Sequence, residues 1–174
     1  MRIYVKGCQM RNSKRKIDGC ISIAEFARKH LMPRQKNLEI NLEFVRNLFD
    51  KEGIYGDCYA PDEDYRPKTF NIRIMGNMKS RNVIQTMAHE MVHVRQYAQG
   101  HLRQYIKARM VEAKGEQKMV WDSEHHWYGE KVNEKQHYYD LPWEIEAHGR
   151  EEGLFVRWAE ENGIGHLKWT QNEI

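Results

Sequence analysis

The sequence of 174 residues is poor in the features that mark cross-linked or membrane-spanning proteins. It has only three cysteines, Cys8, Cys20 and Cys58, and none of them is spaced as C-x-x-C. An odd number at this spacing argues against a disulfide framework and against a structural zinc knuckle, so we expect reduced thiols. No apolar run approaches the roughly 18 to 20 residues that a membrane-spanning helix requires, and we expect no membrane partner.

The beginning of the chain lacks the pattern of a secretory signal, because its basic residues are not followed by a continuous apolar segment. The sequence also lacks internal repeats, low-complexity tracts and Pro/Gly/Ser-rich linkers. Its mass of 20.9 kDa is that of one ordinary domain. We therefore expect a cytoplasmic protein in which residues 1–174 form a single domain.

Charge of one sign does not dominate the composition, since 28 Lys and Arg residues stand against 25 Asp and Glu residues. A hydrophobic fraction of 40% beside a charged fraction of 30% is typical of a soluble globular protein. The densest basic run holds Arg11, Lys14, Arg15 and Lys16. Such a run can contact DNA, but we favour a solvent-exposed loop here.

The hydrophobic periodicity predicts both strands and helices, and hence an α+β fold. Strands are expected at residues 1–7, in the first half of 37–49, at 54–60 and at 68–75, with strand-like pieces in 118–132. The segment 37–49 also fits a helical period. Helices are expected at residues 22–32, 80–100 and about 140–163, where Pro and Gly stand at positions that start or end helices.

Three residues in the middle of the predicted helix 80–100 form the pattern H-E-x-x-H: His89, Glu90 and His93. Because an α-helix has 3.6 residues per turn, the two imidazoles lie one above the other and can face one metal ion. Two Zn–N bonds of about 2.0 to 2.1 Å suit this arrangement. Glu90 is rotated by about 100° from His89, so it can reach a metal-bound water without being a ligand. The motif predicts one zinc ion with Glu90 as general base.

A catalytic zinc ion needs a third protein ligand and keeps one position open for water or substrate. The extended pattern H-E-x-x-H-x-x-G-x-x-H fails, because Gln96 stands where Gly is required and Gln99 where the third His is required. Glu144 and Glu146 lie early in the predicted helix 140–163. Either carboxylate, on a helix packed across from the first, completes a His₂Glu ligand set.

The spacing of these motifs resembles that of gluzincins, the thermolysin-type superclass of zinc metallopeptidases. Glu144 follows His93 by 51 positions, and in that superclass the third ligand opens an E-x-x-x-D motif. The resemblance implies that Glu144 is the ligand and Glu146 is not. In this chain His148 stands where that motif has Asp, so the residue that usually supports the ligand set is replaced.

The segments GDCY, HEMVHVRQYAQG and DLPWEIEAHG together are similar to small phage-encoded metallopeptidase-like proteins of the SprT-like kind, which are related to Spartan-type proteases. The resemblance covers about residues 54–155. It implies a minimal zincin-like fold with its motif-bearing core at about 54–163, in which a small mixed or antiparallel sheet packs on the zinc-bearing helix and on a second helix with the third ligand. SprT-like proteins often use a third histidine, so His148 competes with Glu144 as ligand, or else supports the site from outside the ligand set.

The function expected from these motifs is hydrolysis of peptide bonds in a protein or peptide substrate, in the host cytoplasm if the chain is phage-encoded. A different class remains open, in which zinc only stabilises a non-catalytic binding module such as an inhibitor of a host factor. A third hypothesis ties the peptidase to DNA, by analogy to Spartan. The resemblance to gluzincins further implies that the strand 68–75 lies at the edge of the sheet above the cleft.

Three further expectations concern residues around the site. The donor to the oxyanion of the reaction is left open among Tyr128, Tyr138, Tyr139, His125, His126 and Arg150. The five tryptophans are expected to fill the core. Gly149 and Gly153 lie four residues apart on one helix, which predicts a close approach by a neighbouring backbone, with the metal-bearing helix as first candidate.

Overall fold

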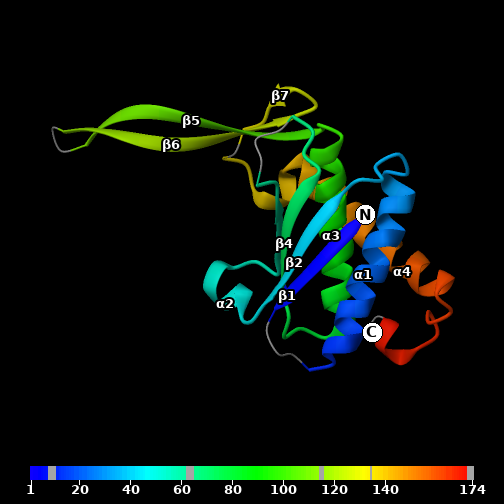
Figure 1. The fold of residues 1–174 in the computed structure, drawn as a ribbon. Helices are drawn as coiled ribbons and strands as arrows, with labels where there is room; N and C mark the ends of the chain where they lie inside the picture. The colour runs from blue at the N-terminus through cyan, green and yellow to red at the C-terminus, as the bar shows by residue number, and fades with distance from the viewer. Residues whose placement is uncertain (8–10, 62–64, 114–115, 134, 172–174) are drawn as a thin grey trace.

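The computed structural model describes residues 1–7, 11–61, 65–113, 116–133 and 135–171, and Cys8 lies outside them. A four-stranded sheet and three long helices form the body, and a two-stranded ribbon projects from it (Figure 1). The fold is α+β, as predicted. Its elements are β1 (Arg2–Gly7), α1 (Ser13–Leu31), β2 (Glu39–Val45), α2 (Leu48–Glu52), β3 (Gly56–Tyr59), β4 (Thr69–Met75), α3 (Ser80–Ala98), β5 (Leu102–Ala113), β6 (Glu116–Trp127), β7 (Glu130–Lys131), a 3₁₀ turn η1 (Tyr138–Asp140), α4 (Pro142–Glu161) and a second 3₁₀ turn η2 (Lys168–Thr170).

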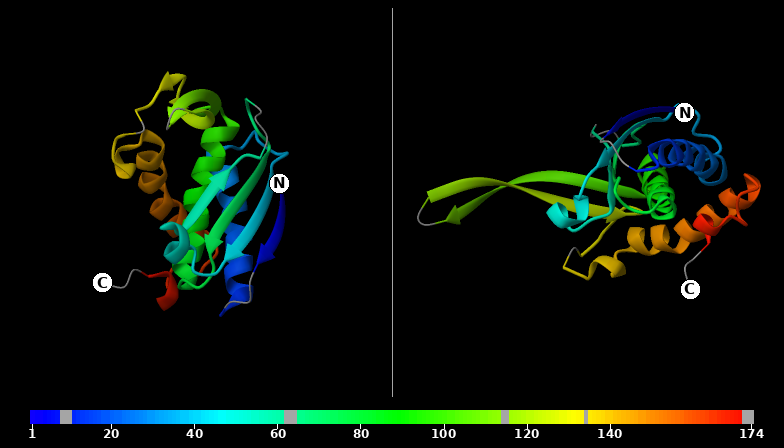
Figure 2. Two further views of the ribbon diagram at one scale, coloured as in Figure 1. Left: turned by 90° about the vertical axis from the view of Figure 1, so that its left-hand side faces the viewer. Right: turned by 90° about the horizontal axis from the view of Figure 1, so that it is seen from below.

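The sheet of the body has the strand order β1-β2-β4-β3. β1, β2 and β4 are parallel, whereas β3 runs antiparallel to β4. Every second residue of β2 and β4 is buried, and these residues are Ile40, Leu42, Phe44, Phe70, Ile72 and Ile74. Helices α1 and α3 cover that face (Figure 2), which explains the apolar alternation that predicted the strands.

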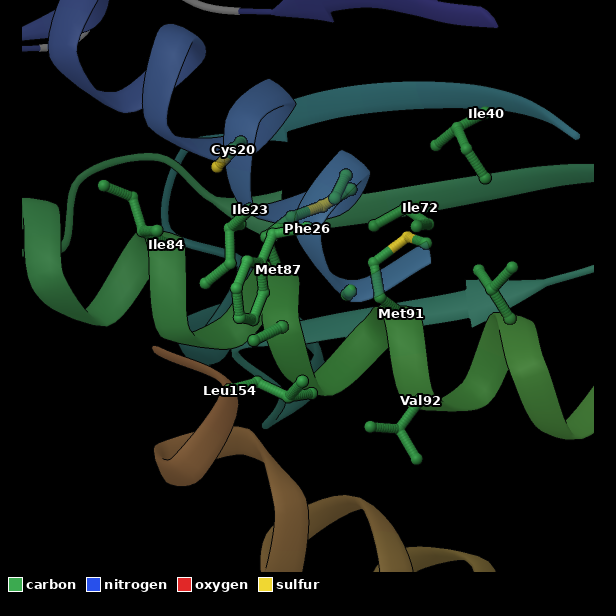
Figure 3. Close-up of a cluster of buried hydrophobic side chains, with 14 of the residues drawn as sticks. Cys20, Ile23, Phe26, Ile40, Ile72, Ile84, Met87, Met91, Val92 and Leu154 are labelled. Atoms are coloured by element: carbon green, nitrogen blue, oxygen red, sulfur yellow. The ribbon is translucent and has the colours of Figure 1, made fainter. Parts of the chain in front are cut away.

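Helix α3 lies between the sheet, α1 and α4, and 13 of its 19 residues are buried. Ile84, Met87 and Met91 meet side chains from α1 and the sheet, while Leu154 of α4 lies on another side (Figure 3). Gly19 of α1 permits the close approach, because a Cβ there would collide with the side chain of Ile84. A helix packed on most of its circumference holds its polar residues in the interior, and this is where the H-E-x-x-H motif falls.

The first helix begins nine residues earlier than predicted, and the basic run is not an exposed loop. Lys16 lies within α1 and is only 3% exposed. Its Nζ donates a hydrogen bond of 2.8 Å to the carbonyl oxygen of Gly76. The long aliphatic stem of lysine allows this burial, because the ammonium group reaches an acceptor beyond the apolar layer. The predicted loop is thus replaced by helix from Ser13 on and Lys16 is buried, whereas Arg11, Lys14 and Arg15 are exposed as predicted.

The other predicted elements are confirmed, with shifts at their ends. The segment 37–49 satisfied both periods because it holds the strand β2 and then the start of the short helix α2. The pieces predicted within 118–132 belong to the long hairpin of β5 and β6. Cys20 and Cys58 are free thiols, as expected. Among the described residues, no helix is long and apolar enough to cross a membrane.

Two predictions about packing were wrong. A Cβ added at Gly149 or Gly153 would meet no atom within 4 Å, because both glycines lie on the exposed side of α4. No close backbone approach therefore explains them. Trp143 and Trp158 are buried as expected, but Trp121 is 68% exposed because it lies on the projecting ribbon.

Candidate metal centre

Helices α3 and α4 bring two histidines and one glutamate together in the protein interior. The Nε2 atoms of His89 and His93 are 3.0 Å apart. Glu144, in the first turn of α4, places its carboxylate oxygens 3.4 Å from Nε2 of His89 and 3.6 Å from Nε2 of His93. Ligand atoms in a tetrahedral site with bonds of about 2.0 to 2.1 Å lie about 3.3 Å from one another. The distances from Glu144 run to its Oε2 and Oε1 respectively, and all three separations are close to this spacing.

The other ring nitrogen of each histidine faces a hydrogen-bond acceptor. Nδ1 of His89 lies 2.7 Å from Oε2 of Glu151, and Nδ1 of His93 lies 2.7 Å from Oε1 of Gln96. An acceptor at Nδ1 favours the tautomer that carries its proton there, which leaves the Nε2 lone pair free for a metal. Both histidines are therefore oriented as ligands by partners that are themselves fixed.

Glu151 is a residue that the sequence reasoning missed. In the gluzincin pattern, the position four residues after the third ligand carries an Asp, and here it carries His148. The carboxylate that supports His89 instead comes from the next turn of α4, and Gln85 donates to its other oxygen over 3.2 Å. Glu144, His148 and Glu151 follow an i, i+4, i+7 spacing, so the helical face shared with the ligand was the available signal.

Gln96 stands at the position where the longer histidine motif requires Gly, and in the structure its side chain connects α3 to α4. It is fully buried, and its Nε2 donates to the carbonyl oxygen of Trp143 over 2.9 Å and to Oε2 of Glu146 over 3.2 Å. Glu146 in turn accepts a 2.6 Å hydrogen bond from Arg95. Glu146 is thus turned away from the three converging ligand atoms, and the structure does not place this alternative ligand in the cluster.

His148 lies beside the cluster rather than apart from it. Its ring centroid is 4.7 Å from that of His89. One ligand atom each of His89, Glu144 and His148 lies within 4.8 Å of the others, so these residues form a second possible ligand group. The side chain is 39% exposed, whereas those of His93 and Glu144 are 10% and 8% exposed. The shorter separations favour His93 over His148 as the partner of His89 and Glu144.

Glu90 lies on α3 directly after His89, and only 3% of the residue is exposed. Burial raises the pKa of Glu90 to about 7, although the neighbouring His93 and His89 act in the opposite direction. Gly56 of β3 makes room for this carboxylate, because a Cβ on Gly56 would come within 2.8 Å of Oε1 of Glu90. Glu90 therefore has a pKa suited to exchanging a proton near neutral pH.

A cavity of about 640 Å³ opens over Glu90 and His89. One wall comes from α2 and the start of β3, with Phe49 and Tyr55 stacked at 4.7 Å between ring centroids. Tyr138, Tyr139 and His148 line the cavity from η1 and α4. Its size is in the range of clefts that hold small ligands or short segments of a chain.

The strand that borders this cavity is β3, not β4 as predicted. β4 pairs with β2 on one side and with β3 on the other, so both of its edges are occupied. Within the described residues β3 pairs with β4 alone, and Gly56 at its start lines the cavity. The prediction failed because strand order is set by contacts distant in sequence, which local alternation does not record.

Among the predicted oxyanion donors, the described structure places Tyr138 closest to the cluster, since its hydroxyl donates to Oε2 of Glu144. Burial and this hydrogen bond raise the pKa of Tyr138, so the hydroxyl keeps its proton. Arg150 bonds to Glu146 over 3.0 Å. The remaining candidates at the base of the ribbon do not line the cavity; they are His125, His126 and Tyr128.

The charges around the cluster favour a cation at its centre. Burial alone lowers the pKa of His89, but hydrogen bonds to Glu144 and Glu151 outweigh this effect and raise the pKa to about 10. Burial acts to raise the pKa of Glu144, but its contacts with His89 and His93 lower it on balance. Two imidazoles and a carboxylate with supporting acceptors are a donor set that fits a metal ion.

Comparisons of the chain with protein-family models, with curated proteins and with solved structures find no match. The resemblance to gluzincins and SprT-like proteins therefore stays a prediction from the motifs. Independently of the motifs, the structure shows a His/Glu/His group within metal-binding distance, made of His89, Glu144 and His148, beside the cavity.

Proposed function

We propose that this chain is a zinc-dependent peptidase of the gluzincin type. One observation carries the proposal: the side chains of His89, His93 and Glu144 converge at 3.0 to 3.6 Å, and His89 and the buried Glu90 line an open cavity. Two nitrogen ligands and one carboxylate leave a fourth position for water or substrate, as in catalytic rather than structural zinc sites.

A bound zinc ion supplies Lewis acidity, which lowers the pKa of a water molecule and polarises the carbonyl that is attacked. Glu90 takes up the proton released in the attack and passes it to the leaving amine, and its raised pKa suits both transfers. Tyr138 and His148 line the cavity. The Tyr138 hydroxyl, which donates to Glu144 in this structure, would turn from that carboxylate to donate to the developing oxyanion.

The substrate is expected to bind as an extended chain beside β3. In the part of the chain that the structure describes, β3 is an edge strand and its first residue lines the cavity. Backbone hydrogen bonds to an edge strand bind a peptide with little dependence on its sequence. The stacked rings of Phe49 and Tyr55 then contact an apolar side chain of the peptide. This site prefers peptides with a large apolar residue near the scissile bond.

The test compares wild type with Glu90→Gln, each loaded with zinc, on a panel of fluorogenic peptides. Glu160→Gln is a matched control, because Glu160 is an exposed glutamate on α4. We expect cleavage by wild type and by the control, and a loss of about 10² to 10⁴-fold in kcat for Glu90→Gln with zinc retained. Equal activity of wild type and Glu90→Gln would refute catalysis by this site.

The alternative of a zinc-stabilised binding module keeps one supporting observation, namely that the ligands come from two helices that a metal ion would tie together. Under this alternative Glu90→Gln retains the biological function, while His93→Ala loses both zinc and folded structure. The link to DNA rests on Arg11, Lys14 and Arg15, which are exposed, since Lys16 of the same run is buried and bonded to a backbone carbonyl.

A further inference from the structure

The β5–β6 ribbon displays four large apolar side chains that are each more than half exposed: Ile106, Met110, Met119 and Trp121. Met110 pairs with Met119 in the ladder, and Ile106 and Trp121 lie at even offsets from this pair. Because side chains alternate between the two faces of a strand, all four project from one face, which we call the apolar face. A contiguous exposed apolar surface of this kind marks an interaction site.

The opposite face of the ribbon is charged, and its charges are paired. Lys107 lies 3.0 Å from Glu124, and Arg109 lies 3.2 Å from Asp122. A nucleic acid or an acidic lipid surface would have to compete with these carboxylates for the cations. The charge pattern therefore favours a partner that is held by the apolar face, and it disfavours a polyanion.

The face of the ribbon that carries the four apolar residues reaches the body close to α4, which supplies Glu144. His125 lies on the same face of the ladder, and its ring is 5.3 Å from that of Trp143, the residue directly before Glu144. From this base the ribbon extends on the side of the molecule where α2 also lies, as both Figure 1 and Figure 2 show. Phe49 of α2 lines the cavity, so ribbon and cavity share that side.

We propose that the apolar face of the ribbon binds an extended, apolar-rich segment of the polypeptide substrate, outside the segment held in the cavity. This inference rests on the proposed peptidase function. β5 has 12 residues and spans about 40 Å, more than a short peptide lying in the cavity reaches. In the described residues β7 pairs only with His126 and Trp127, so the outer part of β6 has a free edge for an added strand. The ribbon thus selects unfolded proteins over short peptides.

The experiment uses full-length chains loaded with zinc and two substrates: reduced, carboxymethylated α-lactalbumin, which is unfolded, and a quenched fluorogenic peptide of about eight residues. The test variant is Met119→Ser with Trp121→Ser, and the matched control is Val120→Thr, which changes the residue between them on the charged face. We expect the test variant to raise KM for the unfolded protein about tenfold, to leave its kcat unchanged and to leave kcat/KM for the peptide unchanged. Equal changes for both substrates, or none, would overturn the proposal.

A binding measurement separates this proposal from that of catalysis. Fluorescence anisotropy of labelled, carboxymethylated α-lactalbumin is followed with Glu90→Gln, alone and combined with the ribbon substitutions. Binding that weakens about tenfold supports the ribbon even if wild type cleaves neither substrate, an outcome that would refute the peptidase alone. Unchanged binding overturns the ribbon, and so does a wild-type dimer that the ribbon substitutions dissociate in sedimentation. If the double variant does not fold, Trp121→Ser alone is measured in its place.

Discussion

The α3–α4 interface and the β5–β6 ribbon depart from the usual distribution of polar and apolar side chains in opposite directions. In the interface, the carboxylates Glu90 and Glu144 are 3% and 6% exposed. On the ribbon, Met119 and Trp121 are 61% and 68% exposed. A buried ionisable group costs stability unless a partner offsets it, whereas an exposed apolar patch costs little stability but marks an interaction surface. The comparison explains why the two proposals differ: we propose a cation for the interface, whose buried carboxylates it would offset, and an apolar partner for the ribbon, whose exposed side chains it would cover.

The largest expected effect follows from removing a ligand in the interface. His93→Ala deletes one of the three converging atoms, so we expect loss of stoichiometric zinc and of about 10³-fold or more in kcat/KM. Zinc content by atomic absorption and cleavage of a fluorogenic peptide measure the two quantities. His166→Ala is the matched control, because His166 is exposed. If His93→Ala retained zinc and activity, His93 would not be a ligand and the interface would not be the proposed metal site.

The buried carboxylate of Glu90 gives the metal-free protein a specific pH dependence. An acid whose pKa is higher in the folded than in the unfolded state contributes stability that is fully present below the unfolded value and is lost as the pH rises through the folded value. For Glu90 these values are 4.5 and about 7, which corresponds to about 3 kcal/mol. Between pH 4.5 and 8, wild type should lose this amount relative to Glu90→Gln. Urea unfolding of both proteins in chelator gives the difference, and parallel pH curves would contradict the assignment.

A smaller effect is expected from the acceptor that orients His89. Glu151→Gln keeps the side chain's shape but removes the charge 2.7 Å from Nδ1, so zinc affinity should fall about 10 to 100-fold without loss of fold. Competition with a fluorescent chelator measures the affinity, and Glu160→Gln on the same helix is the control. An affinity equal to that of wild type would show that the tautomer of His89 does not depend on Glu151.

The smallest effect on stability is expected on the ribbon. Trp121→Ser removes a side chain that has few neighbours, so the free energy of unfolding should change by no more than about 0.5 kcal/mol. The matched substitution Trp158→Ser, in the core, should lose several kcal/mol, roughly 3 to 5. Thermal and urea unfolding distinguish the two. A large loss of unfolding free energy for Trp121→Ser would mean that Trp121 is packed against other residues in solution, which would contradict its description as an exposed side chain.

The parts of the site that could be predicted from the sequence are those that local geometry dictates. The spacing of His89, Glu90 and His93 on one helix decides that two imidazoles share a face, whatever the helix packs against. Glu144 was predicted as a ligand from the resemblance to the gluzincin E-x-x-x-D motif, in which it holds the first position. The spacing could place Glu151 on the same helical face as Glu144, but its contact with His89 and the role of Gln96 could not be assigned, because both depend on the angle and register at which α3 and α4 meet.

The same limit explains the errors in the fold. Lys16 was predicted to be exposed because it is charged. The carbonyl oxygen of Gly76 that accepts its hydrogen bond lies 60 positions away in the sequence. The edge position of β3 depends on strand order, which no local pattern determines. The apolar residues of the ribbon alternate with polar ones, as in a half-buried strand. They are exposed because β5 and β6 project beyond the body, which the local sequence does not determine.

The most direct test of the central claim is a crystal structure of the zinc-loaded protein with anomalous diffraction at the zinc edge. The account predicts one zinc ion at bonding distance from Nε2 of His89, Nε2 of His93 and the carboxylate of Glu144, with Glu90 facing its open side. An ion held by His148 in place of His93, or no ion between α3 and α4, would contradict it.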